Sequence, residues 1–114
     1  MDPKIVGKIR VMKKSAVSLQ KAIDKFSNLD KKYQESESYL QTTIRALEKD
    51  FETYTAIDRE IIAKGVDENE DYEDYVTGEY YDVYKLLYFH HMMTLGEALK
   101  RVTTSDIHNS TRSN

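Results

Sequence analysis

The chain has 114 residues and a formal net charge of −3, with 39% hydrophobic and 32% charged residues. This length suits one domain, and the composition is too rich in aliphatic and aromatic side chains for a disordered chain. The absence of cysteine excludes disulfides, thiolate zinc sites and thiol catalysis. No apolar run approaches the roughly 18 residues of a membrane span, and the charged first residues lack a signal-peptide core, so we expect an intracellular protein, cytoplasmic or nuclear.

The first predicted helix covers residues 3–26. Pro3 follows Asp2, an arrangement typical of a first helical position after an N-cap. Apolar residues then recur at steps of four and three, which places them on one face of a helix. They are Ile5, Ile9, Met12, Ala16, Leu19, Ile23 and Phe26. Basic residues surround this stripe, namely Lys4, Lys8, Arg10, Lys13, Lys14, Lys21 and Lys25.

A second helix is predicted over residues 29–64, after a short turn. It contains no glycine or proline, and the same spacing of apolar residues resumes within it. Its stripe consists of Tyr33, Leu40, Ile44, Leu47, Phe51, Tyr54, Ile57 or Asp58, and Ile61. Lys64 and Gly65 are typical of a helix end, where glycine can adopt a positive φ.

The third predicted helix covers residues 69–101 and begins with an acidic turn. Its main buried stripe is predicted to be Tyr72, Val76, Tyr80, Val83, Leu87, His90 or His91, and Thr94. Further residues should thicken this stripe, namely Tyr75, Tyr84, Leu86, Tyr88, Phe89 and Met93. Gly78 and Gly96 each weaken the helix by about 1 kcal/mol relative to alanine. Residues 103–114 have no periodicity and are predicted to form a flexible tail.

These elements predict an all-α fold, with residues 1–102 forming a single domain of three long antiparallel helices. The first helix is the shortest, so the bundle is either an up-down-up bundle or an extended helical hairpin that the first helix covers in part. An apolar strip left uncovered near one end would favour a homo-oligomer or a helical protein partner. The alternative is that the third helix bends back or the helix ends fray.

Six of the nine tyrosines of the chain lie between residues 72 and 88. Tyrosine combines apolar area with a polar tip, which suits protein interfaces. One interpretation is a partner-binding face formed by Tyr75, Tyr81, Tyr84 and Tyr88. The other is core packing in which the hydroxyl groups reach the edge of the core.

Charge is distributed unevenly, since residues 1–33 hold nine basic and three acidic residues while residues 66–82 hold eight acidic and no basic residues. The basic face of the first helix could bind nucleic acid, an anionic membrane or an acidic protein partner. Equally, its lysines could form a solvated face or meet the acidic start of the third helix, in the same chain or a neighbouring one.

No pattern in the sequence predicts catalysis, a metal site, a cofactor or a small-molecule substrate. His90 and His91 are adjacent, whereas a two-histidine site on one helix needs spacing of four residues. Glu97 could add a carboxylate, but a third ligand has no candidate. The chain has no nucleophile elbow and no glycine-rich phosphate loop. We therefore expect a non-enzymatic interaction or self-association domain.

Residues 29–87 resemble the helical region that begins the Gag polyproteins of Pao/BEL-type retrotransposons. The resemblance rests on Leu40, Ile44, Leu47, Phe51 and Tyr54, on residues 71–75 (Asp-Tyr-Glu-Asp-Tyr), on residues 79–81 (Glu-Tyr-Tyr), and on Val83 and Leu87. It covers about half of the chain and implies a role in particle self-assembly or in the contacts of a domesticated Gag remnant. The capsid-like region, cysteine-rich knuckle and protease motif of the family are missing here.

Overall fold

The computed structural model describes the backbone of residues 2–66 and 68–112 and the side chains of residues 2–66 and 68–104. Within these ranges the chain forms helices and no strand, which confirms the predicted all-α class. The helices are α1 (Pro3–Ser27), α2 (Lys31–Gln34), α3 (Glu37–Lys64), α4 (Glu70–Gly78) and α5 (Tyr80–Arg112).

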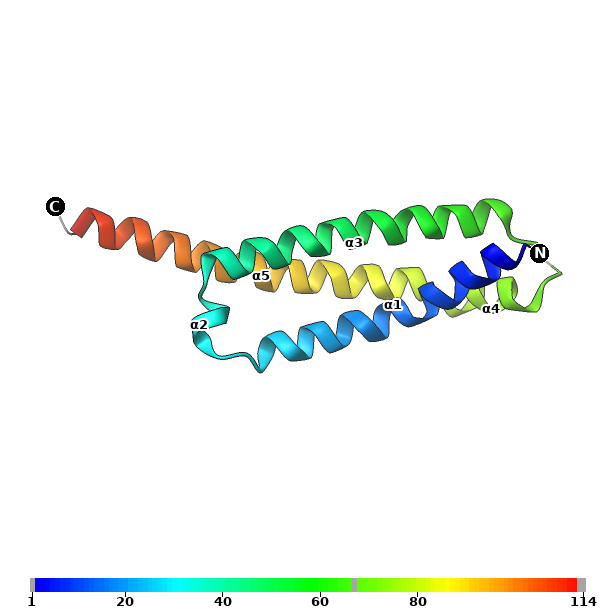
Figure 1. Cartoon of the computed structure of the whole chain (residues 1–114), viewed down its shortest axis with the longest axis horizontal. Coiled ribbons are helices and arrows are strands. Elements are labelled where there is room, and N and C mark those ends of the chain that lie inside the picture. The colour runs from blue at the N-terminus through cyan, green and yellow to red at the C-terminus, as the bar shows by residue number, and fades with distance from the viewer. Residues whose placement is uncertain (1, 67, 113–114) are drawn as a thin grey trace.

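Helices α1, α3 and α5 lie side by side in a rod that measures 69 × 24 × 19 Å (Figure 1). They run up, down and up, and each contacts the other two. The single turn α2 connects α1 to α3, and α4 packs on α1 at the opposite end of the rod. The last part of α5 extends past α2, where α1 and α3 no longer cover it (Figure 1).

The helix predicted over residues 29–64 is divided in the structure. The turn α2 ends two residues before α3, and the Ser36 hydroxyl accepts a hydrogen bond from the Tyr39 backbone N–H at 3.2 Å. The Gln34 side-chain amide donates to the Phe26 carbonyl oxygen at 2.8 Å, which ties α2 to the end of α1. Ser36 therefore caps α3, and this local bond is why the helix begins later than its apolar pattern indicates.

The helix predicted over residues 69–101 is divided at Gly78 and Glu79. Glu79 has a φ of 53°, in the left-handed region, and it separates α4 from α5. A side chain at position 78 would strike the Tyr80 ring, because a Cβ atom there would lie 2.4 Å from Tyr80 Cε2. Gly78 thus permits the change of direction, where the sequence indicated only a weak point in one helix.

This break changes the direction in which the side chains of α5 point relative to those of α4. On a continuous helix Tyr75 and Tyr84 would point in opposite directions, since nine residues at about 100° each make two and a half turns. Both are buried in the structure. The predicted stripe assumed one phase and is wrong at exposed positions Val76, Val83 and Thr94, while His91 rather than His90 is buried.

The end of α5 also differs from the prediction. The helix was expected to end near residue 101, but it continues to Arg112, and residues 113 and 114 lie outside the described part of the chain. Residues 102–112 contain neither glycine nor proline. A loss of apolar periodicity removes packing but does not by itself stop a helix.

Gly65 follows α3 as predicted, but for a different reason. Its φ is −69° and its ψ is 152°, so it does not adopt the expected positive φ. A Cβ atom at this position would lie 1.9 Å from Tyr72 Cε2. Glycine leaves room here for the Tyr72 ring of α4, which lies directly against the backbone.

The core consists of two clusters that follow one another along the rod. The first contains Ile5, Ile9, Met12, Ile61 and Tyr75. The second contains Leu19, Leu40, Leu47, Tyr84, Tyr88, Leu95 and Ala98. Tyr54 and Tyr81 pack against both clusters and make the core continuous. The apolar stripes predicted for the first two helices are confirmed, except that Tyr33 is exposed.

Candidate interaction surface

Three of the four tyrosines predicted to bind a partner lie in the core. Their exposed fractions are 3% for Tyr75, 2% for Tyr84 and 7% for Tyr88, and Tyr81 is partly buried. The Tyr75 hydroxyl donates to Asp58 Oδ1 at 2.5 Å. Burial raises the pKa of Tyr75, and the Asp58 carboxylate raises it further. The docking-face interpretation is wrong for these three residues, and the alternative of core packing holds.

Phe51 of α3 packs on α5 through stacked aromatic rings. Its ring lies 4.1 Å from the Tyr88 ring, with the two planes at 7°, and 6.4 Å from the Tyr84 ring. Phe89, on the next position of α5, lies 5.8 Å from Phe51 in a tilted arrangement. Because Phe89 is half exposed, one part of its ring touches the core and the rest faces outward.

Two stripes at heptad spacing lie on opposite sides of α5. The inner stripe faces α1 and α3 and consists of Tyr81, Tyr84, Tyr88, His91, Leu95, Ala98 and Val102. The outer stripe consists of Asp82, Leu86, Phe89, Met93, Gly96 and Lys100, and all six residues are exposed. Successive residues of the outer stripe are four and three positions apart, so they follow one another along a single face.

The centre of the outer stripe is an exposed apolar patch. The exposed fractions are 70% for Leu86, 50% for Phe89 and 65% for Met93. The sequence predicted that these three would thicken the buried stripe, which is wrong. Single exposed apolar side chains are ordinary, whereas neighbours on consecutive turns form the kind of patch found at protein interfaces. The signal was present in the sequence, because a helix that is apolar on both sides needs cover on both.

Two of the seven basic residues of α1 are engaged within the chain. Lys8 forms an ion pair with Glu60 of α3, and Lys13 forms one with Asp74 of α4. The hydrogen bond from Lys13 lowers the pKa of Asp74, and Lys13 Nζ lies 5.7 Å from the centre of the Tyr80 ring. The Lys13 pair corresponds to the alternative in which lysines of the first helix meet the acidic start of the third.

The other basic residues of α1 are exposed, namely Lys4, Arg10, Lys14, Lys21 and Lys25. Four of them, beginning at Arg10, are spaced by four, seven and four positions. This spacing places them on one side of α1, away from its apolar stripe. The predicted basic face is therefore smaller than the sequence indicated but still present on the surface.

The adjacent histidines occupy different environments. His91 is buried, with its ring 5.8 Å from the Phe26 ring in an edge-on arrangement, whereas His90 is exposed. Burial lowers the pKa of His91, and the neighbouring His90 lowers it further. Among the side chains that the structure describes, no group of three or more potential ligands is placed to hold a metal ion.

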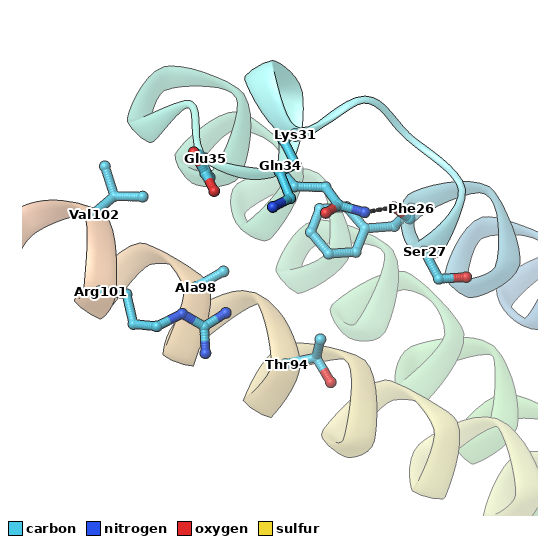
Figure 2. Close-up of a pocket in the computed structure, with 9 residues that line it drawn as sticks. All are labelled: Phe26, Ser27, Lys31, Gln34, Glu35, Thr94, Ala98, Arg101 and Val102. Atoms are coloured by element: carbon cyan, nitrogen blue, oxygen red, sulfur yellow. Dashed lines mark hydrogen bonds between the residues drawn. The ribbon is translucent and has the colours of Figure 1, made fainter.

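A cleft of about 700 Å³ lies between the end of α1, the turn α2 and α5 (Figure 2). Phe26 contributes apolar lining, and Lys31 and Arg101 contribute positive charge. The hydroxyl groups of Ser27 and Thr94 each donate to a carbonyl oxygen of their own helix, at 2.9 Å and 3.1 Å. Both hydroxyls are thus engaged with the backbone rather than with a base that could activate them.

Over the described residues, none of the helices has a stretch long and apolar enough to cross a membrane. Comparisons of the chain with models of known protein families, with curated proteins and with solved structures found no match.

Proposed function

We propose that this protein is a non-enzymatic helical module that associates with itself through the outer stripe of α5. The observation that supports the proposal is the exposed row of Leu86, Phe89 and Met93 on a helix whose other side already forms the core. The three long helices cover one another's inner faces. A further helix laid against α5 would cover the outer stripe and complete a larger bundle.

The expected association is weak. Full burial of a leucine, phenylalanine or methionine side chain contributes about 1.5–3 kcal/mol. Since 50–70% of each of the three side chains is exposed, covering them on two copies contributes roughly 5–11 kcal/mol. Association itself costs about 4–15 kcal/mol. At its most favourable the balance is about 7 kcal/mol, which corresponds to a dissociation constant on the order of 10 µM, so any dimer is weak, as suits a module that several contacts hold in a larger assembly.

The resemblance of residues 29–87 to the first helical region of Pao/BEL-type Gag polyproteins leads to a narrower version of the proposal. In that version the chain contributes to the assembly of a particle, or makes the corresponding contacts as a domesticated Gag remnant. Weak self-association that becomes effective when many copies are linked or concentrated is the property that such a role requires.

Light scattering coupled to size-exclusion chromatography over a wide concentration range tests the proposal. We expect a mass that rises toward that of a dimer with increasing concentration, and a monomer at all concentrations for the Leu86→Asp/Met93→Asp double variant. Val17→Asp is the matched control, because Val17 is 57% exposed on α1 and lies outside the outer stripe. A wild-type protein that stays monomeric at millimolar concentration refutes the proposal.

The exposed basic side of α1 favours a second candidate function, the docking of an anionic surface. Lys8 and Lys13 form ion pairs within the chain. Four other basic residues are exposed and share one side of the helix, namely Arg10, Lys14, Lys21 and Lys25. Binding to single-stranded RNA or to vesicles with anionic lipids should weaken steeply between low and physiological salt. Replacing these four residues with glutamine should abolish such binding without changing the oligomeric state.

A further inference from the structure

We propose that the occupant of the outer stripe is the same stripe of a second copy, arranged antiparallel about a two-fold axis that passes beside position 91. This inference rests on the proposed self-association and adds the partner, the orientation and the register. It follows from the order of charges and side-chain sizes along the stripe, because the outer stripe begins with an acidic residue, Asp82, and ends with a basic one, Lys100.

The residues of the outer stripe form three pairs that are each centred on position 91. Asp82 pairs with Lys100, Leu86 with Gly96, and Phe89 with Met93. An antiparallel dimer with this centre therefore places opposite charges together at both ends and apolar residues together in the middle. A two-fold axis repeats every contact, so each dimer contains two copies of each pair.

The two inner pairs are complementary in size and chemistry. A Cβ atom built on Gly96 would meet nothing within 4 Å, so the surface there is open to receive a large side chain. Leu86, at 70% exposure, is the most exposed of the three apolar side chains and would lie over this opening in the partner. The Phe89 ring would contact the Met93 thioether of the partner, a pairing that is favourable between sulfur and aromatic groups.

A parallel dimer through the same stripe would be poorly matched. It would place Asp82 against Asp82 and Lys100 against Lys100, which repel each other. It would also place Gly96 against Gly96, which leaves a gap between the helices. The charges of the stripe therefore select the antiparallel arrangement, although they add little to the affinity.

Disulfide trapping tests the register. Because the chain has no native cysteine, every disulfide that forms must join the introduced cysteines. Asp82→Cys and Lys100→Cys variants are mixed, oxidised and examined by intact mass spectrometry, which separates the mixed dimer from the two homodimers. We expect the mixed dimer only, since residues 82 and 100 face each other across the interface. The two copies of residue 82 are about 27 Å apart in this arrangement, given a rise of 1.5 Å per residue, and cannot form a disulfide.

Charge reversal gives an independent readout of the same pairing. Asp82→Lys and Lys100→Asp should each weaken dimerisation about tenfold, because two ion pairs are replaced by two repulsions. The double variant Asp82→Lys/Lys100→Asp should return the dissociation constant to within about threefold of the wild-type value. Failure of the double variant to recover would count against the register.

The outcomes separate this inference from the proposed function. A monomer at all concentrations removes both. A dimer that yields homodimeric disulfides at residue 82 or 100, or that yields no disulfide at all, overturns the antiparallel register while self-association stands. A mixed disulfide together with recovery by the double charge reversal supports the register.

Discussion

Phe51 and Tyr88 lie ring against ring, with their centroids 4.1 Å apart and their planes at 7°, and this contact joins the two longest helices at the middle of the rod. The same Phe51 ring also contacts Tyr84 and Phe89. One side chain of α3 thus contacts two residues of α5 that lie in the core and one that lies at its edge. The orientation of the outer stripe depends on this aromatic cluster.

Removal of the Phe51 ring should destabilise the fold strongly. We expect Phe51→Ala to lower the free energy of unfolding by about 3 kcal/mol, near the lower end for phenylalanine because the side chain is partly buried. Urea denaturation followed by circular dichroism at 222 nm measures the change. Phe89→Ala, at the exposed edge of the same cluster, is the control and should cost much less.

The rotation of α5 can be tested by placing one charge on the exposed part of α5 and another in the core face of α3. Leu47→Asp should unfold the protein, because Leu47 is 8% exposed in the core and a buried carboxylate has no partner there. Val83→Asp should change the free energy of unfolding by less than about 1 kcal/mol, since Val83 is 46% exposed. Comparable losses of helical signal for both variants would contradict the register described above.

Replacing glycine with alanine should have opposite effects on stability at two positions. Gly65→Ala should destabilise the protein, because the new Cβ would lie 1.9 Å from Tyr72 Cε2 and the ring would have to move. Gly7→Ala should stabilise it by about 0.5–1 kcal/mol, since Gly7 lies within α1 and its added Cβ meets nothing within 4 Å. The melting temperatures of the two variants provide the comparison.

His91 should make stability depend on pH. Burial lowers its pKa in the folded state below the value of about 6.5 expected for the unfolded chain. The unfolded chain therefore binds a proton more readily, and the stabilising contribution is full above pH 6.5 and is lost as the pH falls through the folded pKa. Urea denaturation between pH 5 and pH 8 should show this decline. It should disappear in His91→Leu and persist in His90→Gln.

The apolar stripes of α1 and α3 could be predicted because their spacing continues without interruption through each helix. Ile5 and Leu19 share a stripe on α1, as do Leu40 and Ile61 on α3, and all four are buried as expected. The start of α3 and the end of α4 could not be predicted, since they depend on a local hydrogen bond, the Ser36 cap, and on one unusual backbone angle, the left-handed φ of Glu79. A single hydroxyl or one unusual φ angle leaves little trace in a pattern that extends over thirty residues.

The exposed apolar stripe of α5 was harder to predict than the fold for a related reason. Apolar side chains occupy two faces of α5, and composition does not say which face turns inward. That choice depends on the phase after Glu79 and on the aromatic contacts of Phe51, both of which are three-dimensional. Once the inner face is known, Leu86 and Met93 identify the outer face without further assumption.

The left-handed residue at position 79 has a consequence for how this chain tolerates change. Because Glu79 interrupts the helix, the residues that α4 buries and those that α5 buries need not lie on one continuous helical stripe. A residue added to or removed from the segment before α4 would leave the direction of Leu86 and Met93 unchanged, whereas one inserted between Tyr84 and Leu86 would turn them by about 100° relative to the core. The exposed apolar side of α5 is thus insensitive to changes of length before α4 and sensitive to changes of length within α5 itself.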